Sequence, residues 1–225
     1  MHVVVMPWKD RTPYLRLTLA TMEEAARGRH DVHVIIYNNG SLDDLPYIVT
    51  DLTWLKVQVR ELPVTDCHYN YVNMLRDVFE DNEFKDVNHV ITQDADGCIH
   101  PHFFDVADHA IDDLPDLGHF SFFNEDCHPE PTGVCKEIYH YREHISFFST
   151  IIARAAWDAF PTPNFGDPMK DNCMDGNFSW FVHQKTPLKV YSTIRSYAEH
   201  IGMEGQHVIK RPDKEIIARA RRFYA

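Results

Sequence analysis

Asp94 and Asp96 are the residues of this sequence whose types and spacing most directly suggest chemistry. They follow an apolar, strand-like run at residues 89–91 and precede Gly97. Side chains at positions i and i+2 of an extended backbone project from the same face, so both carboxylates can act on one ligand. Carboxylates are hard oxygen ligands that suit Mg²⁺ or Mn²⁺, and a divalent ion held here would neutralise a diphosphate. An exposed turn is the alternative interpretation, because Asp and Gly also favour turns.

The elements that must position these carboxylates alternate between strands and helices. Strands are expected over residues 2–6, 32–37, 54–59 and 88–93, and helices over residues 12–28, 43–49 and 69–79. Such alternation is typical of βαβ units and a mostly parallel sheet with right-handed crossovers. Ligands of open α/β sheets bind beyond the carboxyl ends of the strands, which is where the two carboxylates stand. The sequence therefore predicts a Rossmann-like, nucleotide-binding half over residues 1–97.

The second half of the chain is less regular. Strands are expected over residues 117–123, 145–153 and 189–191, helices over 101–111 and from Asp175 past Trp180, and loops over 124–143 and 162–173. Residues 98–209 are interpreted as a second, less regular half of the same domain. The last segment, 210–225, is predicted to be a basic helix, because six Lys or Arg residues stand there against two acids. We expect one domain over residues 1–225.

Composition excludes several classes of protein. A net charge of −12 argues against a general nucleic-acid binder. Five cysteines without a C-x-x-C pair favour a reduced, cytoplasmic protein over a disulfide scaffold. A strand that begins at His2 leaves no room for a signal peptide, and no apolar run approaches the ~18 residues of a membrane span. The fifteen histidines show no zinc-ligand spacing.

Four segments in order resemble the GT-A fold glycosyltransferases of the family 2 type. They are the opening strand with Arg11 and Tyr14, the second strand and turn at 35–44, the D-x-D triplet at 94–96, and the acidic segment 174–179. The resemblance covers residues 2 to about 207. It implies a GT-A fold, with a mostly parallel central sheet flanked by helices and a less regular acceptor-side half.

The resemblance also implies which residues bind the nucleotide sugar. They are Pro7, Trp8, Arg11, Asn38, Asn39, Asn73, Asp94 and Asp96. Asn38 stands where the family usually has an Asp that reads the base. Its amide oxygen can accept a hydrogen bond from a uracil N–H, so UDP is favoured, although Asn leaves the base open. Instead of binding the nucleotide, Trp8 could cap the hydrophobic core, and Asn73 could face solvent.

Asp175 is the candidate general base, because the base of the resembled family occupies this position. A helix N-terminus stabilises its anionic form, and the alternative is an N-cap for the amides of Asn177 or Phe178. Met174 replaces the usual first acid of this motif, and Asp171 is the nearest rival. The resemblance implies a metal site for Mn²⁺ or Mg²⁺ made by Asp94, Asp96 and His200, with His207 as the second candidate histidine.

The sequence thus predicts a metal-dependent, inverting glycosyltransferase that uses a nucleoside-diphosphate sugar. Three acceptors stay open: a saccharide, a lipid-linked glycan, and a hydroxylated DNA base as in phage. Residues 210–225 could contact a peripheral membrane or a polyanion. One alternative is a sugar-nucleotide pyrophosphorylase or other nucleotidyltransferase. Such enzymes normally have a Gly-rich phosphate loop early in the chain, and residues 6–11 contain no glycine. The other is a nucleotide-sugar-binding protein without catalysis.

Overall fold

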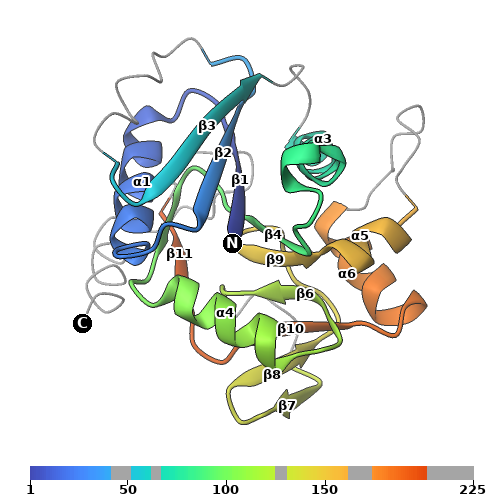
Figure 1. Ribbon diagram of the computed structural model, residues 1–225. Coiled ribbons are helices and arrows are strands. Elements are labelled where there is room, and N and C mark those ends of the chain that lie inside the picture. Colours follow the sequence, from blue (N-terminus) through green and yellow to red (C-terminus); the bar gives the residue numbers. More distant parts are fainter. Residues whose placement is uncertain (42–51, 62–66, 125–130, 162–173, 202–225) are drawn as a thin grey trace.

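A nine-stranded sheet runs through the computed structural model, which describes residues 1–41, 52–61, 67–124, 131–161 and 174–201 (Figure 1). The strand order is β3-β2-β1-β4-β9-β6-β10-β8-β7. The strands are β1 (His2–Trp8), β2 (Val32–Asn38), β3 (Leu55–Glu61), β4 (His89–Thr92), β6 (Leu117–Ser121), β7 (Gly133–Cys135), β8 (Tyr139–Arg142), β9 (Thr150–Ala153) and β10 (Lys189–Thr193). A second, two-stranded sheet joins β5 (Gly97–Ile99) to β11 (Ala198–His200).

The large sheet is mostly parallel, as predicted. β3, β2, β1 and β4 pair with each other in parallel. β9 runs antiparallel between β4 and β6, and β6 pairs with β10 in parallel. β8 is antiparallel to both β10 and β7. Within the large sheet, β9 and β8 therefore run against the other seven described strands, and the α/β class is confirmed.

Helices cover both faces of the sheet. They are α1 (Thr12–Ala25), α3 (Cys67–Glu80), α4 (Phe103–Asp113), α5 (Arg154–Ala159) and α6 (Met174–Lys185), with a 3₁₀ turn η1 (Asn82–Phe84). Alternate residues of β1 face different cores: Val4 and Met6 pack with α1 and α4, whereas Val3 and Val5 pack with α3, α5 and α6. Figure 1 shows α1 and α3 on opposite sides of β1–β3. Burial on both faces explains why this strand is a continuous apolar run.

Several sequence predictions of local structure were wrong. Part of the loop expected over residues 124–143 is the β7–β8 hairpin, in which the strand-favouring tyrosines of β8 pair with β10 and outweigh the Pro and Gly residues nearby. The strand expected over residues 145–153 is only β9, because Ser149 has a φ of 53° that ends extended backbone. α1 begins at Thr12, as expected, with Arg11 as its N-cap residue, but it ends at Ala25, three residues before the expected end.

Three predicted elements lie outside the described residues: the helix at 43–49, the loop at 162–173 and the basic helix at 210–225. Within the described ranges, none of the helices has both the length and the apolar character that a bilayer crossing requires.

Candidate active site

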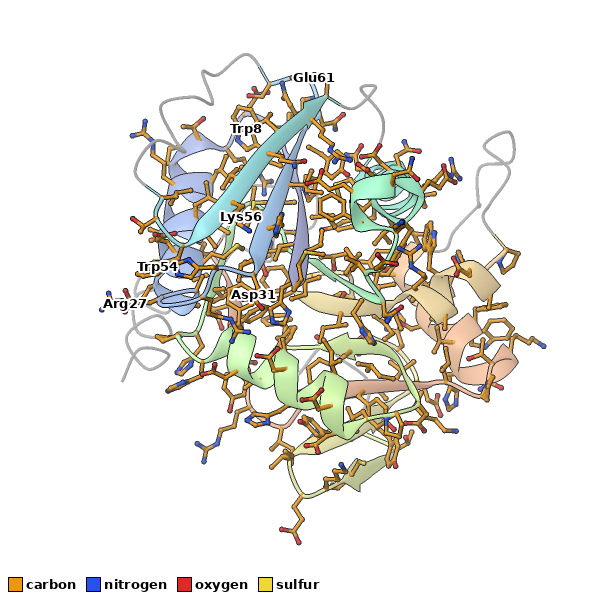
Figure 2. The ribbon with its side chains drawn as sticks, viewed as in Figure 1. Trp8, Arg27, Asp31, Trp54, Lys56 and Glu61 are labelled. Carbon is orange, nitrogen blue, oxygen red and sulfur yellow. The ribbon has the colours of Figure 1, made fainter. Side chains whose placement is uncertain are left out.

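Polar side chains gather where β1, β2, β3 and β4 end, and we call this side of the sheet the carboxyl edge. Because the four strands are parallel, the register places Trp8 beside Asn38 and Asn38 beside Glu61. The backbone amide of Gln93 donates to the Val5 carbonyl at 3.0 Å, so the pairing of this segment with β1 continues beyond β4 toward Asp94. Segments distant in the sequence are thus brought to one edge (Figure 2, where Trp8 and Glu61 are labelled).

The loop that carries the two carboxylates is fixed from several sides. The Thr18 hydroxyl of α1 donates to the Ala95 carbonyl at 2.9 Å, and the Gly97 amide closes the turn on the Asp94 carbonyl at 3.3 Å. A Cβ added at Gly97 would lie 2.2 Å from Gln93 Nε2 and 2.5 Å from the Phe148 ring. Only glycine fits there, so the turn between β4 and β5 is tightly packed.

Asp94, Asp96 and His200 form a cluster whose candidate ligand atoms all lie within 4.8 Å of one another. β11 pairs with β5 and sets His200 opposite Gly97, and the Ile201 amide donates to the Asp96 carbonyl at 2.9 Å. His200 Nε2 stands 3.3 Å from Asp96 Oδ1. The structure therefore brings together the three residues that the sequence predicts as metal ligands. His207 lies outside the described residues.

This donor set fits a hard divalent ion. Two carboxylates and one imidazole suit Mn²⁺ or Mg²⁺, and Mn²⁺ in particular accepts nitrogen beside oxygen. The Asp96 side chain is 3% exposed, and a buried carboxylate needs a cationic partner. Burial, together with the negative charge of Asp96, raises the pKa of Asp94. A cation between the two carboxylates would relieve both effects.

Arg11 supplies a cation of the chain itself. Its guanidinium donates to Asp96 Oδ2 from the N-cap position of α1, directly after β1. The side chain is 35% exposed, so it reaches from the buried carboxylate toward solvent. A guanidinium in this position can also bind a phosphate with two hydrogen bonds.

Tyr71 is a further residue of the site, which the sequence did not single out. Its hydroxyl donates to Asp94 Oδ1 from α3. Burial raises the pKa of Tyr71 well above 10, and the negative charges of Asp94, Asp96 and Asp175 act in the same direction. The phenol therefore stays a donor that orients Asp94, and Asp175 lies near enough to affect it.

Asp175 occupies the first turn of α6, as predicted, and is half-buried. Its Oδ1 accepts from the Gly176 backbone amide at 2.8 Å. A Cβ added at Gly176 would lie 2.7 Å from His144 Nε2, so His144 packs directly against this turn. His144 is a second residue near the site that the sequence analysis did not single out.

Asn38 and Asn39 form the turn after β2. Asn38 Oδ1 accepts from the Ser41 amide at 2.8 Å, and Asn38 Nδ2 lies 3.2 Å from Glu61 Oε1. The Asn39 amide donates to the Trp8 carbonyl at 2.9 Å. Glu61, at the end of β3, is therefore a neighbour of the predicted base-reading residue, and it was also missed.

The remaining predicted nucleotide-binding residues differ in exposure. Trp8 is 1% exposed and packs in the core beneath the edge, and its Nε1 has no hydrogen-bond partner among the described residues. Pro7 is half-buried at the end of β1. Asn73 is half-buried on α3, two residues after Tyr71, a spacing that directs the two side chains to different sides of the helix.

Glycosyltransferases are among the solved structures with a similar fold. S. aureus TarS 1-349 in complex with UDP matches with a TM-score of 0.59 and 16% identity over 88% of this chain and 60% of that one. The mannosyltransferase PcManGT from Pyrobaculum calidifontis, in complex with GDP-Man and Mn²⁺, matches with a TM-score of 0.57 and 14% identity over 90% of this chain and 57% of that one. No protein-family model and no curated protein matches the sequence.

These likenesses confirm the GT-A fold that the sequence predicts. The chain spans about three fifths of the length of these two structures.

Proposed function

We propose that this protein is a metal-dependent glycosyltransferase that moves a sugar from a nucleoside-diphosphate sugar to an acceptor hydroxyl with inversion. The observation that carries the proposal is the cluster of Asp94, Asp96 and His200 at the carboxyl edge, within 4.8 Å of one another. The GT-A fold supports it, and so do the similar structures, which are complexes with UDP, with UDP-GlcNAc, and with GDP-Man and Mn²⁺.

A divalent ion held by Asp94, Asp96 and His200 would act as a Lewis acid for the departing diphosphate. The residues of the chain do the remaining work. Tyr71 orients Asp94 through its hydroxyl, and Arg11 exchanges its contact with Asp96 for one with the diphosphate. Tyr71 thereby holds the Asp94 carboxylate in position for the divalent ion, and Arg11 adds positive charge beside the diphosphate. Both effects stabilise the negative charge of the leaving group.

Asp175 takes the proton of the acceptor hydroxyl. The acceptor oxygen forms a bond to the anomeric carbon while the bond from that carbon to the diphosphate oxygen breaks, and the diphosphate leaves with the electron pair. Direct displacement needs the base on the side opposite the leaving group, which gives inversion. The acceptor is a saccharide, a lipid-linked glycan or a hydroxylated DNA base.

Titration calorimetry tests the donor half of this proposal. We expect a nucleoside diphosphate to bind with Mn²⁺ present, and binding to be lost in Asp96→Asn. Asp105→Asn is the matched control, because Asp105 is an exposed carboxylate that contacts Arg29 and His102 away from the edge. Failure of every nucleoside diphosphate to bind with Mn²⁺ would refute the proposal.

Product analysis separates the enzymatic alternatives. Release of pyrophosphate from a nucleoside triphosphate would favour a nucleotidyltransferase. Binding of a nucleotide sugar with neither transfer nor hydrolysis would favour a protein that only binds it.

A further inference from the structure

The order of strands along the carboxyl edge sets where each part of a bound nucleotide would lie, given the proposed function. Neighbouring strands are about 4.8 Å apart, so β2 lies about 10 Å and β3 about 14 Å from β4. A diphosphate beside Asp94 and Asp96 at β4, with its ribose over the end of β1, therefore brings the base to the ends of β2 and β3. Those ends are Asn38 and Glu61, which are register partners.

The contacts of Asn38 determine what this pair offers to a base. Its amide oxygen accepts from the Ser41 amide at 2.8 Å, and its amide nitrogen faces the Ser41 carbonyl at 3.4 Å and Glu61 Oε1 at 3.2 Å. The oxygen is thus engaged in the turn. One N–H of the amide points at the Ser41 carbonyl and the other at Glu61. A base carbonyl that takes the place of the long contact to Ser41 would meet an N–H donor next to the exposed carboxylate of Glu61.

Guanine matches this arrangement better than the other bases. Its base-pairing edge carries a carbonyl oxygen next to two donors, N1–H and the 2-amino group, and a carboxylate accepts two parallel N–H bonds. Uracil offers one N–H between two carbonyl oxygens, so one carboxylate oxygen would face a carbonyl. Adenine and cytosine present a ring-nitrogen lone pair to the carboxylate. A mismatch of this kind leaves polar groups unpaired.

We propose that Asn38 and Glu61 together read the base and select guanine, so that the donor is a guanosine-diphosphate sugar. The prediction of UDP from the sequence rests on Asn38 alone. The carboxylate that changes the preference comes from a strand 23 residues further along the chain.

Nucleotide titrations in the presence of Mn²⁺ test this specificity. We expect wild type to bind GDP at least about tenfold more tightly than UDP, and about tenfold more tightly than IDP, which lacks the 2-amino group. Glu61→Gln should weaken GDP about 10- to 100-fold, leave UDP within a few fold, and improve binding of XDP, whose 2-carbonyl accepts from the new amide.

Glu83→Gln is the matched control. Glu83, in η1, accepts from the side-chain amide of Gln58 at 3.2 and 3.3 Å. This is also an exposed contact between a carboxylate and a side-chain amide, but Gln58 lies in the middle of β3 rather than at its end. Its nucleotide preferences should equal those of wild type. Tighter binding of UDP than of GDP, unchanged by Glu61→Gln, would overturn the base assignment and leave the proposed function standing. Absence of binding by all four diphosphates would overturn both.

Discussion

Two polar clusters at opposite ends of the same strands have nearly the same composition. The carboxyl edge has Asp94, Asp96 and Asp175 with Arg11 and His200. The amino edge, where β1, β2 and β3 begin, has Asp31, Asp105 and Asp108 with Arg29 and His2. Figure 2 shows Asp31 at the end of the strands opposite Trp8 and Glu61.

Burial of the carboxylates distinguishes the two clusters. At the amino edge the side chains of Asp31, Asp105 and Asp108 are 43%, 59% and 46% exposed, and Arg29 pairs with all three. Burial acts to raise the pKa of Asp31, but the charge of Arg29 and its hydrogen bond outweigh it, so the pKa is lowered. At the carboxyl edge Asp96 is almost fully buried, and the pKa of Asp94 is raised.

Solvent and Arg29 already stabilise the three carboxylates of the amino edge. The carboxylates of the carboxyl edge are buried and repel each other, so a further cation would stabilise them more. Burial of like charges, rather than the types of residue present, therefore distinguishes the edge that we propose as the active site.

The largest expected difference comes from removing one carboxylate at each edge. Asp96→Asn should abolish detectable turnover and weaken Mn²⁺ binding by more than the ~100-fold that loss of an outer-shell partner costs. Asp108→Asn should leave Mn²⁺ binding unchanged and lower the free energy of unfolding by at most about 1 kcal/mol, because the pair is partly solvated. Electron paramagnetic resonance of bound Mn²⁺ measures the first effect, and denaturant unfolding the second. Equal effects of both variants on Mn²⁺ binding would contradict the comparison.

Asp175→Asn tests the base at the carboxyl edge. The amide keeps an oxygen for the Gly176 amide, so the turn should survive, but it cannot accept the acceptor's proton. We expect kcat to fall about 10²- to 10⁴-fold with nucleotide affinity unchanged. Single-turnover transfer and calorimetry measure the two quantities. A variant with wild-type kcat would assign the base to another residue.

The sequence predicted this site where a local pattern encodes it. Asp94 and Asp96 stand two residues apart shortly after a strand, and Asp175 lies in the first turn of a helix with a visible motif. Tyr71, Glu61 and His144 were missed because their roles depend on partners far along the chain. An aromatic residue on an apolar helix stripe is indistinguishable by pattern from a core residue.

The fold shows the same division. β1, β2 and β4 are short, mostly apolar runs, a pattern that indicates a buried strand, and all three were predicted. β5 and β11 are three residues each and pair across about 100 positions, so no local periodicity indicates them. His200 was predicted from the resemblance, and this small sheet is what delivers it to Asp96.

Tyr71→Phe should have a smaller effect than loss of either acid. It removes the hydroxyl that orients Asp94 and keeps the ring packed against Phe147, with centroids 5.3 Å apart. We expect Mn²⁺ affinity to fall about 10- to 100-fold without a change in the unfolding midpoint beyond a few degrees. Tyr37→Phe, which removes a hydroxyl bound to Asp77 at 2.6 Å outside the cluster, is the control. Unaltered Mn²⁺ affinity in Tyr71→Phe would show that Asp94 needs no such orientation.

Glycine substitutions compare the packing of the two ends. Gly97→Ala places a methyl group against Gln93 and Phe148, which should cost about 1–3 kcal/mol of stability and also weaken Mn²⁺ binding. Gly28→Ala meets no atom within 4 Å but has a φ of 79°, so it should cost about 1–2 kcal/mol of stability alone. Thermal unfolding with and without Mn²⁺ distinguishes them. Loss of Mn²⁺ binding in Gly28→Ala would contradict the separation of the edges.

The smallest effect is the response of the amino edge to pH. Burial lowers the pKa of His2, against the opposing charge of Asp108, so the unfolded chain binds a proton more readily than the folded one. Stability should therefore fall as pH drops below about 6.5, by at most about 1.4 kcal/mol per pH unit, until the folded-state pKa is reached. His2→Gln should reduce the slope of this part of the unfolding profile, to which the lowered pKa values of His89 and His119 also contribute, and leave Mn²⁺ binding unchanged. A profile that is unchanged in His2→Gln would place the acid-sensitive group outside the amino edge.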